Sequence, residues 1–228
     1  MQVAILAGGL GQRLLPLTET VPKPLVAVHG RPFLDYQLRL LRRHGATRVV
    51  MMTGYLGAKI QAEFGDGAEY GLALTYSRET TPLGTGGALK LAEPLLDETF
   101  MVVNGDTYLD MDYAAAARAF AAADCDALMA VYDNPGQALA PNNVLVACGM
   151  VARYDKDDSR GLTHIDAGVY AFRRSLLTGL TAGQRYALER DLIPRLAHRG
   201  RLMAYSVGQR YYDIGTLDRL AAAADVLK

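Results

Sequence analysis

Short apolar runs that end in glycine or in turn residues recur along the first half of the chain. Uninterrupted runs of this length are typical of strands that are buried on both faces of a parallel sheet. They predict strands over residues 3–6, 48–53, 72–76 and 100–103. The stretches between them have apolar positions at helical spacing. That spacing predicts helices over residues 33–44, 58–64, 87–96 and 113–123.

The second half of the chain has a looser pattern with longer polar connections. Strands are predicted over 127–131, 144–147, 151–154 and 165–172, with a loop over 133–143 and helices over 187–198 and 217–227. The alternation of strands and helices predicts an α/β fold with an open, mostly parallel sheet and helices on both faces. We find no linker or internal repeat, so we expect a single domain with an elaborated second half.

Composition and charge exclude several classes of function. The chain has 228 residues, with 24 basic and 24 acidic side chains. A net charge of zero argues against a broad surface for nucleic acid or an anionic membrane, but it permits a local phosphate site. The two cysteines are too few for a disulfide scaffold. The N-terminus has no basic leader and no apolar run approaches the roughly 20 residues that span a bilayer, so we expect a cytoplasmic protein.

A glycine-rich loop follows the first predicted strand, with the sequence Leu-Ala-Gly-Gly-Leu-Gly-Gln-Arg over residues 6–13. Glycines let backbone amides approach an anion and permit positive φ angles. The dinucleotide fingerprint fails because Leu14 stands where it needs glycine, and no lysine follows the last glycine as a Walker motif requires. Arg13 and Lys23, the latter held between two prolines, complete a candidate triphosphate cradle. The alternative is a tight turn beside a solvated lysine.

Seven motifs together resemble those of the sugar-1-phosphate nucleotidylyltransferases. They are residues 6–13, 22–24, 30–34, 54–56, 82–88, 104–107 and 212–216. In its length and in the residues of the motifs at 82–88 and 212–216, the chain is most similar to D-glycero-D-manno-heptose-1-phosphate guanylyltransferases. The resemblance covers nearly the whole chain and is densest in the first 110 residues.

The resemblance implies a Rossmann-like fold of the nucleotide-diphospho-sugar transferase type. A nucleotide-binding half would span about 1–112 and a sugar-phosphate-binding half about 113–228 of the single domain. The expected reaction moves a nucleotidyl group from a nucleoside triphosphate to a sugar 1-phosphate and releases pyrophosphate. GTP and heptose 1-phosphate are the first choices, with UTP or dTTP as alternatives. These two substrates are the expected partners, and neither nucleic acid nor a membrane is expected. The oligomeric state is left open, with a homo-oligomer as one alternative.

The resemblance also assigns roles to residues of the loop. Arg13 would stabilise the triphosphate and the leaving pyrophosphate, and Lys23 would bridge the two reacting phosphates. The nucleotide-binding residues would be Leu6, Ala7, Gly8, Gly9, Gly11, Arg13, Leu83, Gly84, Thr85 and Gly86.

Two distant carboxylates, Asp106 and Asp213, are the candidate metal ligands. Asp106 follows the strand predicted over 100–103, where ligands bind in open α/β sheets. Its alternative role is that of a capping aspartate in a turn. The resemblance implies that the two aspartates hold Mg²⁺, which takes oxygen ligands and bridges substrate phosphates.

Two Asp-x-Asp strings favour a rival function, because metal-dependent glycosyltransferases hold a nucleotide-sugar with such a pair. Here Asp110 and Asp112 are better placed to begin the alanine-rich helix, and Asp124 and Asp126 to form the turn after it. A protein that binds a sugar nucleotide without turnover is a third hypothesis.

The acceptor site is expected in the second half, together with Asn104. The family commonly has Glu-Lys-Pro where this chain has Asp155, Lys156 and Asp157, and its lysine contacts the sugar phosphate. Spacing alone favours an ordinary polar turn at this point. Asp166 and Gly168 fall where the family often has Asn-Ala-Gly, with aspartate in place of asparagine, and the resemblance implies contacts of Asp166 with the sugar hydroxyls and a close approach of the Gly168 backbone to the acceptor.

Overall fold

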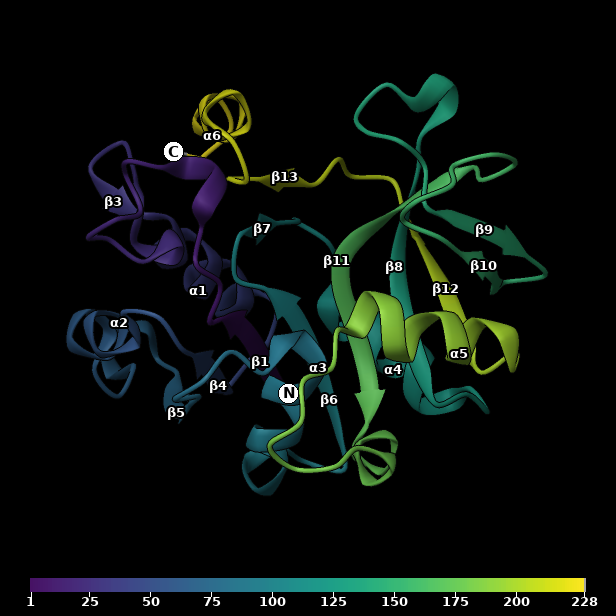
Figure 1. The fold of residues 1–228 in the computed structure, drawn as a ribbon, viewed down its shortest axis with the longest axis horizontal. Coiled ribbons are helices and arrows are strands. Elements are labelled where there is room, and N and C mark those ends of the chain that lie inside the picture. The colour runs from purple at the N-terminus through teal and green to yellow at the C-terminus, as the bar shows by residue number, and fades with distance from the viewer. Residues whose placement is uncertain (228) are drawn as a thin grey trace.

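The protein is described by a computed structural model that covers residues 1–227, so Lys228, the last residue of the predicted sugar-phosphate half, lies outside the described residues. The strands of the main sheet are β1 (Gln2–Ala7), β4 (Arg48–Thr53), β5 (Ala73–Arg78), β6 (Thr99–Asn104), β8 (Ala127–Asp133), β9 (Val144–Ala147), β10 (Met150–Tyr154), β11 (His164–Arg173) and β12 (Leu202–Val207). Their order in the sheet is β5-β4-β1-β6-β11-β8-β12-β10-β9 (Figure 1).

The described residues form six α-helices. They are α1 (Phe33–Arg43), α2 (Gly57–Phe64), α3 (Gly84–Ala92), α4 (Tyr113–Ala122), α5 (Ile193–His198) and α6 (Leu217–Ala224). Alternate residues of each strand point to opposite faces, and this alternation divides the core in two. One face packs against α1, α2 and α4. The opposite face packs against α3 and α5, so the predicted α/β architecture with helices on both faces is confirmed.

The first half of the sheet is parallel, as its apolar runs predict. β1 pairs in parallel with β4 on one side and β6 on the other, and β4 pairs in parallel with β5. The register places Leu6 opposite Asn104 and Ala7 opposite Thr53. The carboxyl ends of these strands therefore meet at one edge, where the loops that follow them converge.

The second half is mixed rather than parallel, because β11 runs antiparallel to both β6 and β8. The structure also contains β12, a strand parallel to β8 that the sequence pattern did not predict. The helix predicted over 187–198 forms as a π-helical turn, Leu188–Leu192, which continues into α5. The helix predicted over 87–96 begins earlier, at Gly84, and tightens into a 3₁₀ turn at Glu93–Leu95, where Pro94 lacks an amide donor.

Two small ladders complete the fold. β2 (Ala27–Val28) pairs with β3 (Arg31–Pro32), and β7 (Thr107–Tyr108) pairs with β13 (Tyr212–Asp213). A third apolar cluster packs α6 against the segment that follows the glycine loop, through Leu14, Phe33, Ile214 and Ala223. The end of the described chain thus lies beside the segment that follows the glycine loop (Figure 1). Among residues 1–227, no helix has the length and apolar character needed to cross a bilayer.

Candidate active site

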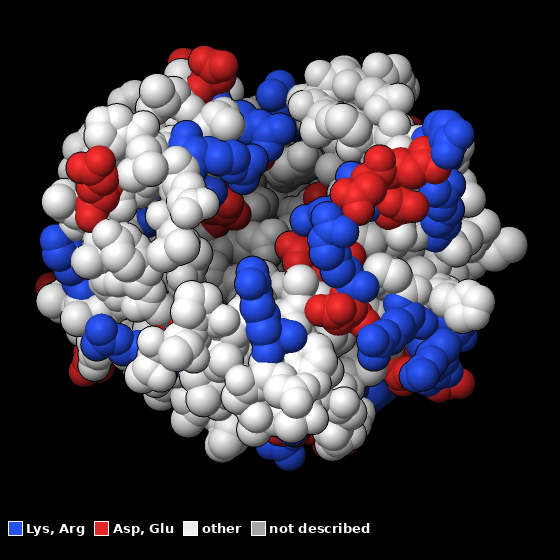
Figure 2. All heavy atoms as spheres, viewed as in Figure 1, with Lys and Arg blue, Asp and Glu red and all other residues white. Residues whose placement is uncertain are grey.

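A cavity of about 1310 Å³ opens at the carboxyl ends of the parallel strands. Figure 2 shows this face hollowed near its centre, with basic and acidic side chains around the hollow. The lining includes many residues that the sequence singled out: Leu6, Ala7, Gly8, Gly9, Gly11, Arg13, Lys23, Gly84, Thr85, Asn104 and Asp106. The structure therefore brings the glycine loop, the two candidate catalytic cations and one candidate metal ligand to a single cavity.

Two glycines of the loop are needed for different structural reasons. Gly11 has φ +65°, a left-handed conformation that favours glycine, and its carbonyl accepts a hydrogen bond from Thr18 Oγ1 at 2.9 Å. Gly8 does not have a positive φ angle, but a Cβ on it would lie 3.0 Å from Glu79 Oε1. The expectation of positive φ in this loop therefore holds for Gly11, whereas Gly8 makes room for a carboxylate.

The start of α3 forms another wall of the cavity. Gly84 has φ +71°, and a Cβ on it would lie 2.5 Å from the Tyr186 carbonyl oxygen. The Gly86 amide donates a hydrogen bond to the same oxygen at 2.8 Å. Gly84 and Thr85 line the cavity, whereas Leu83 and Gly86 are buried behind it. The absence of a side chain at Gly84, Gly86 and Gly87 lets residues 184–186 pack directly against the helix start.

Lys23 lies in contact with Asp106, to which its Nζ donates a hydrogen bond. The lysine begins a 3₁₀ turn, Lys23–Leu25, directly after Pro22 in extended conformation. Its side chain is 13% exposed and that of Asp106 is 30% exposed, so the pair is partly shielded from water. Partial burial strengthens an ion pair relative to an exposed one.

Gln37 of α1 supports the turn that carries Asp106 through hydrogen bonds. Gln37 is fully buried, and its Nε2 donates hydrogen bonds to the carbonyl oxygens of Asn104 at 2.9 Å and Thr107 at 2.7 Å. These carbonyls lie on either side of Asp106. A Cβ on Gly105 would lie 2.6 Å from the Leu6 carbonyl oxygen, so this turn also requires glycine there.

Asp213 reaches the same region through the ladder between β7 and β13. This ladder places it opposite Thr107, and the Ile214 amide donates a hydrogen bond to the Asp106 carbonyl oxygen at 3.1 Å. The Asp213 carboxylate accepts hydrogen bonds from Arg219 Nη1 and the Gly215 amide, each at 2.8 Å. Asp213 is not a lining residue of the cavity, but Gly215 is.

Asp106, in the turn before β7, and Asp213, in β13, are the two candidate carboxylates for Mg²⁺. Within residues 1–227, no group of three or more His, Cys, Asp or Glu side chains is arranged to hold a metal. Mg²⁺ commonly uses one or two carboxylates and completes its coordination with water and substrate phosphate oxygens. The donor set of Asp106 and Asp213 therefore fits this ion in its chemistry.

The predicted acceptor residues lie beside the cavity. Lys156 Nζ donates to Glu189 Oε1 at 3.2 Å, and Glu189 lines the cavity. Burial raises the pKa of Glu189, but the Lys156 charge together with hydrogen bonds from the backbone, Lys156 and Thr85 holds that pKa below its ordinary value. A Cβ on Gly168 would lie 2.9 Å from Asn104 Nδ2. Of the predicted acceptor residues, Asn104 lines the cavity, whereas Lys156 and Gly168 do not line it but contact the lining residues Glu189 and Asn104.

Asp166, the fourth predicted acceptor residue, is enclosed by hydrogen-bond donors. Its carboxylate accepts from Tyr170 Oη at 2.6 Å, from Tyr154 Oη at 3.3 Å and from the Gly168 amide at 2.9 Å. Burial raises the pKa of Asp166, although the Tyr170 hydroxyl and the Gly168 amide stabilise its charge.

The Asp-x-Asp strings have structural partners away from the cavity. Asp112 caps α4 by accepting from the Ala115 amide at 2.8 Å, and Asp110 accepts from Arg43 at 2.6 Å. Asp124 and Asp126 each accept from Arg201 at 3.0 Å. These four aspartates are not among the cavity-lining residues of the described chain. This placement agrees with the predicted helix start and turn, and it disfavours the glycosyltransferase function.

Sequence reasoning missed two acidic residues of the cavity, Glu79 and Glu189. Glu79 comes directly after β5, so its position at the carboxyl end of a parallel strand could have identified it. Its Oε2 accepts a hydrogen bond from the Leu83 amide at 2.9 Å. Glu189 gave no such signal, because it lies within a segment that the pattern predicts to be an ordinary helix.

Comparison with known proteins agrees with this arrangement. An N-acetylmuramate α-1-phosphate uridylyltransferase of Neisseria meningitidis is 34% identical, covering 98% of this chain and 96% of its own length. A mannose-1-phosphate guanylyltransferase of Mycobacterium tuberculosis is 32% identical over 100% of this chain. A UTP–glucose-1-phosphate uridylyltransferase of Synechocystis is 30% identical over 94% of it. This chain spans 65% and 60% of the length of the last two relatives.

A solved structure has the same fold. The crystal structure of HddC from Yersinia pseudotuberculosis superposes with a TM-score of 0.83 at 27% identity, covering 100% of this chain and 99% of that one. Residues 2–228 match the sequence profile of the family described as nucleotidyl transferase. Because this match extends over almost every residue, including the glycine loop, Lys23 and Asp106, the chain belongs to the nucleotidyl transferase family.

Proposed function

We propose that this protein transfers a nucleotidyl group from a nucleoside triphosphate to a sugar 1-phosphate and releases pyrophosphate. The observation that carries the proposal is the contact between Lys23 and Asp106 in a cavity that the glycine loop and Arg13 also line. Backbone amides and two cations suit a triphosphate, and the size of the cavity leaves room for a second anionic substrate.

The proposed reaction is an in-line displacement without a covalent enzyme intermediate. An oxygen of the acceptor phosphate forms a bond to the α-phosphorus, and the bond from that phosphorus to the bridging oxygen of pyrophosphate breaks. Both reactants are anions, so the enzyme must position them and neutralise their charge. We assign neutralisation of the leaving pyrophosphate to Arg13 and of the two reacting phosphates to Lys23.

Asp106 and Asp213 are the residues that would hold Mg²⁺. When bound, the ion would polarise the α-phosphate and orient the reactants. Lys23 would turn from the Asp106 carboxylate toward substrate phosphate, because a phosphate group offers it additional acceptor oxygens.

Within this reaction we propose GTP as the donor and heptose 1-phosphate as the acceptor. Two observations support guanine. A structure of HddC, 27% identical to this chain, was solved as a complex with GMP-PN. Glu79 lines the cavity, and its Oε2 accepts from Leu83, so Oε1 is the oxygen that faces Gly8 and Gly54. A carboxylate oxygen suits guanine, whose Watson–Crick edge has two adjacent donor groups, N1–H and N2–H. A heptose 1-phosphate guanylyltransferase of Aneurinibacillus thermoaerophilus, 26% identical, supports the acceptor.

A pyrophosphate-release screen tests the proposal. GTP, UTP, dTTP, CTP and ATP are each combined with a panel of sugar 1-phosphates that includes heptose 1-phosphate, with and without Mg²⁺. We expect release with GTP and heptose 1-phosphate that depends on both substrates and on the metal. Faster turnover with UTP or dTTP would overturn the base preference alone. Tight binding without release from any pair would overturn the enzyme function in favour of a sugar-nucleotide-binding protein.

A further inference from the structure

The loop over residues 155–160, between β10 and β11, lies against the π-helical turn Leu188–Leu192. Two consecutive residues of the loop pair with two consecutive residues of the turn. Lys156 pairs with Glu189 at 3.2 Å, and Asp157 pairs with Arg190. The loop supplies the cation of the first pair and the anion of the second. A shift by one residue would place like charges opposite each other, so the two pairs favour one register of the loop against the turn.

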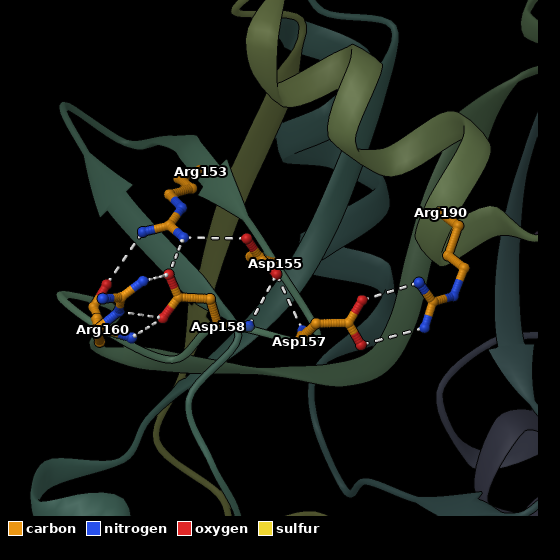
Figure 3. Close-up of polar contacts among 6 residues, drawn as sticks. All are labelled: Arg153, Asp155, Asp157, Asp158, Arg160 and Arg190. Carbon is orange, nitrogen blue, oxygen red and sulfur yellow. Dashed lines mark hydrogen bonds and ion pairs between the residues drawn. The ribbon is translucent and has the colours of Figure 1, made fainter.

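The outer pair has the geometry of a bidentate fork. Arg190 Nη1 donates to Asp157 Oδ2 at 2.9 Å and Arg190 Nη2 donates to Asp157 Oδ1 at 3.2 Å. Figure 3 shows the two parallel contacts, with Arg190 reaching across from its own segment to the loop. Two simultaneous hydrogen bonds fix the orientation of both groups as well as their distance.

The loop keeps its own shape through separate contacts. Asp155 Oδ1 accepts from the amides of Asp157 at 2.9 Å and Asp158 at 3.0 Å. Arg153 donates to Asp155 at 3.0 Å and to Asp158 at 3.2 Å, and Arg160 also pairs with Asp158 (Figure 3). The fork to Arg190 is therefore not needed to form the loop, and its effect is on where the loop lies.

The π-helical turn also contacts the start of α3, which forms another wall of the cavity. Thr85 Oγ1 donates to Glu189 Oε2 at 3.1 Å and accepts from the Leu188 amide at 2.7 Å. The turn thus connects the start of α3 to the loop that carries Lys156. Asp157 and Arg190 are not among the lining residues of the described cavity, so they act on a ligand only through their neighbours.

We propose that Asp157 and Arg190 are a positioning pair that holds Lys156 at the rim of the cavity and thereby sets the affinity for the anionic acceptor. The inference rests on the proposed function and on the contact between Lys156 and the sugar phosphate that the family resemblance implies. Both side chains are mostly exposed, 71% for Asp157 and 65% for Arg190, so substituting them leaves the core intact. The pair therefore acts on the position of Lys156 rather than on folding.

The test compares Asp157→Asn, Arg190→Gln and the charge-reversed double variant Asp157→Arg with Arg190→Asp. We expect each single variant to raise KM for the sugar 1-phosphate about two- to fivefold, in the range of one exposed ion pair. KM for the nucleoside triphosphate and the melting temperature stay at wild-type values. The double variant restores the acceptor KM, because it recreates the fork with its charges exchanged. Arg48→Gln, which breaks the exposed pair with Asp97 outside the cavity, is the control and changes neither KM.

Hydrogen exchange provides a readout that is independent of turnover. We expect amides of residues 155–160 to exchange faster in Arg190→Gln than in the wild type, with full recovery in the double variant. Unchanged exchange and unchanged acceptor KM in the single variants would overturn the positioning role.

Lys156→Ala separates this inference from the function on which it rests. We expect it to raise the acceptor KM at least about tenfold, as the loss of a charged hydrogen bond does. If Lys156→Ala has this effect and the Asp157 and Arg190 variants do not, the positioning pair alone is overturned. If Lys156→Ala has no effect on the acceptor KM, both the acceptor role of Lys156 and the positioning pair are overturned. Absence of pyrophosphate release by the wild type would overturn the proposed function and this inference together.

Discussion

Lys23 and Asp106, predicted from separate motifs to be a catalytic cation and a metal ligand, contact each other directly in the cavity. Each neutralises the other, so neither is an isolated charge in a partly buried site. The arrangement holds both groups at the cavity, close to the position where phosphate charge has to be stabilised in the proposed reaction. It also means that substituting either residue changes the surroundings of the other.

Lys23→Ala should reduce the turnover number about 100- to 1,000-fold, the loss typical of removing one preorganised group that stabilises transition-state charge. Pyrophosphate release under saturating substrates measures the loss, and circular dichroism checks that the fold is intact. Lys90→Ala is a matched control, because Lys90 is similarly shielded, 16% exposed, and pairs with Glu93 at 2.6 Å. Wild-type turnover in Lys23→Ala would remove Lys23 from the catalytic machinery.

Asp106→Asn should shift the Mg²⁺ dependence of the reaction. The amide removes one of two candidate carboxylate ligands, so we expect the half-activating Mg²⁺ concentration to rise by at least about tenfold. Mn²⁺ binding followed by electron paramagnetic resonance gives a readout without turnover. Asp110→Asn serves as the control, since Asp110 pairs with Arg43 and His44 outside the cavity. A Mg²⁺ titration of Asp106→Asn that overlays the wild type would show that the metal assignment is wrong.

Gln37→Leu should lower turnover as well as stability. Loss of both donors leaves the Asn104 and Thr107 carbonyls without this partner, which costs about 1–3 kcal/mol of the free energy of unfolding. The turn that carries Asp106 is then less well positioned, and we expect about a tenfold lower turnover number. Steady-state kinetics and urea unfolding measure the two effects.

Gln2→Leu is the matched control for Gln37→Leu. Gln2 is also buried, donates to the Leu95 carbonyl at 2.9 Å and accepts from the Asp97 amide at 2.7 Å, but it does not line the cavity. It should lose stability without losing turnover. Equal turnover in both variants would limit Gln37 to a structural role.

Asp166 predicts a pH dependence of stability. Burial raises the pKa of Asp166 in the folded protein, whereas the pKa of an aspartate in the unfolded chain is about 3.9. Between these two values the native state holds the proton and the unfolded state does not, so the free energy of unfolding falls as pH rises. Asp166→Asn cannot titrate. We expect the stability of the wild type relative to this variant to decrease above about pH 4 and to level off above the folded pKa.

Urea unfolding of the wild type and Asp166→Asn at a series of pH values measures this difference. Asp158→Asn should show a difference of the opposite sign, because hydrogen bonds from Arg160 hold the pKa of Asp158 below its ordinary value. That contribution is present above the ordinary pKa and is lost as pH falls. Stability curves of Asp166→Asn and the wild type that run parallel at every pH would contradict the prediction.

Much of the first half was predictable because its signals are local. Apolar runs and helical spacing identify β1, β4, β5 and β6 and the helices between them, since each pattern reflects burial of a single element. The glycine loop and Lys23 were also found, because their function depends on backbone conformation within a few residues. In the second half, β12 was missed, because it is only partly buried and does not form the continuous apolar run that identifies the other strands.

The sequence by itself predicted which residues would carry the proposed chemistry: the glycine loop, Arg13, Lys23 and Asp106. Only the tertiary structure decided which of them meet. The β7–β13 ladder brings Asp213 beside the Asp106 turn, packing places Glu79 against Gly8, and the π-helical turn delivers Glu189 to Lys156. These contacts depend on strand order, register and long-range packing, which many residues determine jointly and no short motif encodes. Short motifs thus identify the candidate residues of the site, whereas the whole fold sets the distances between them.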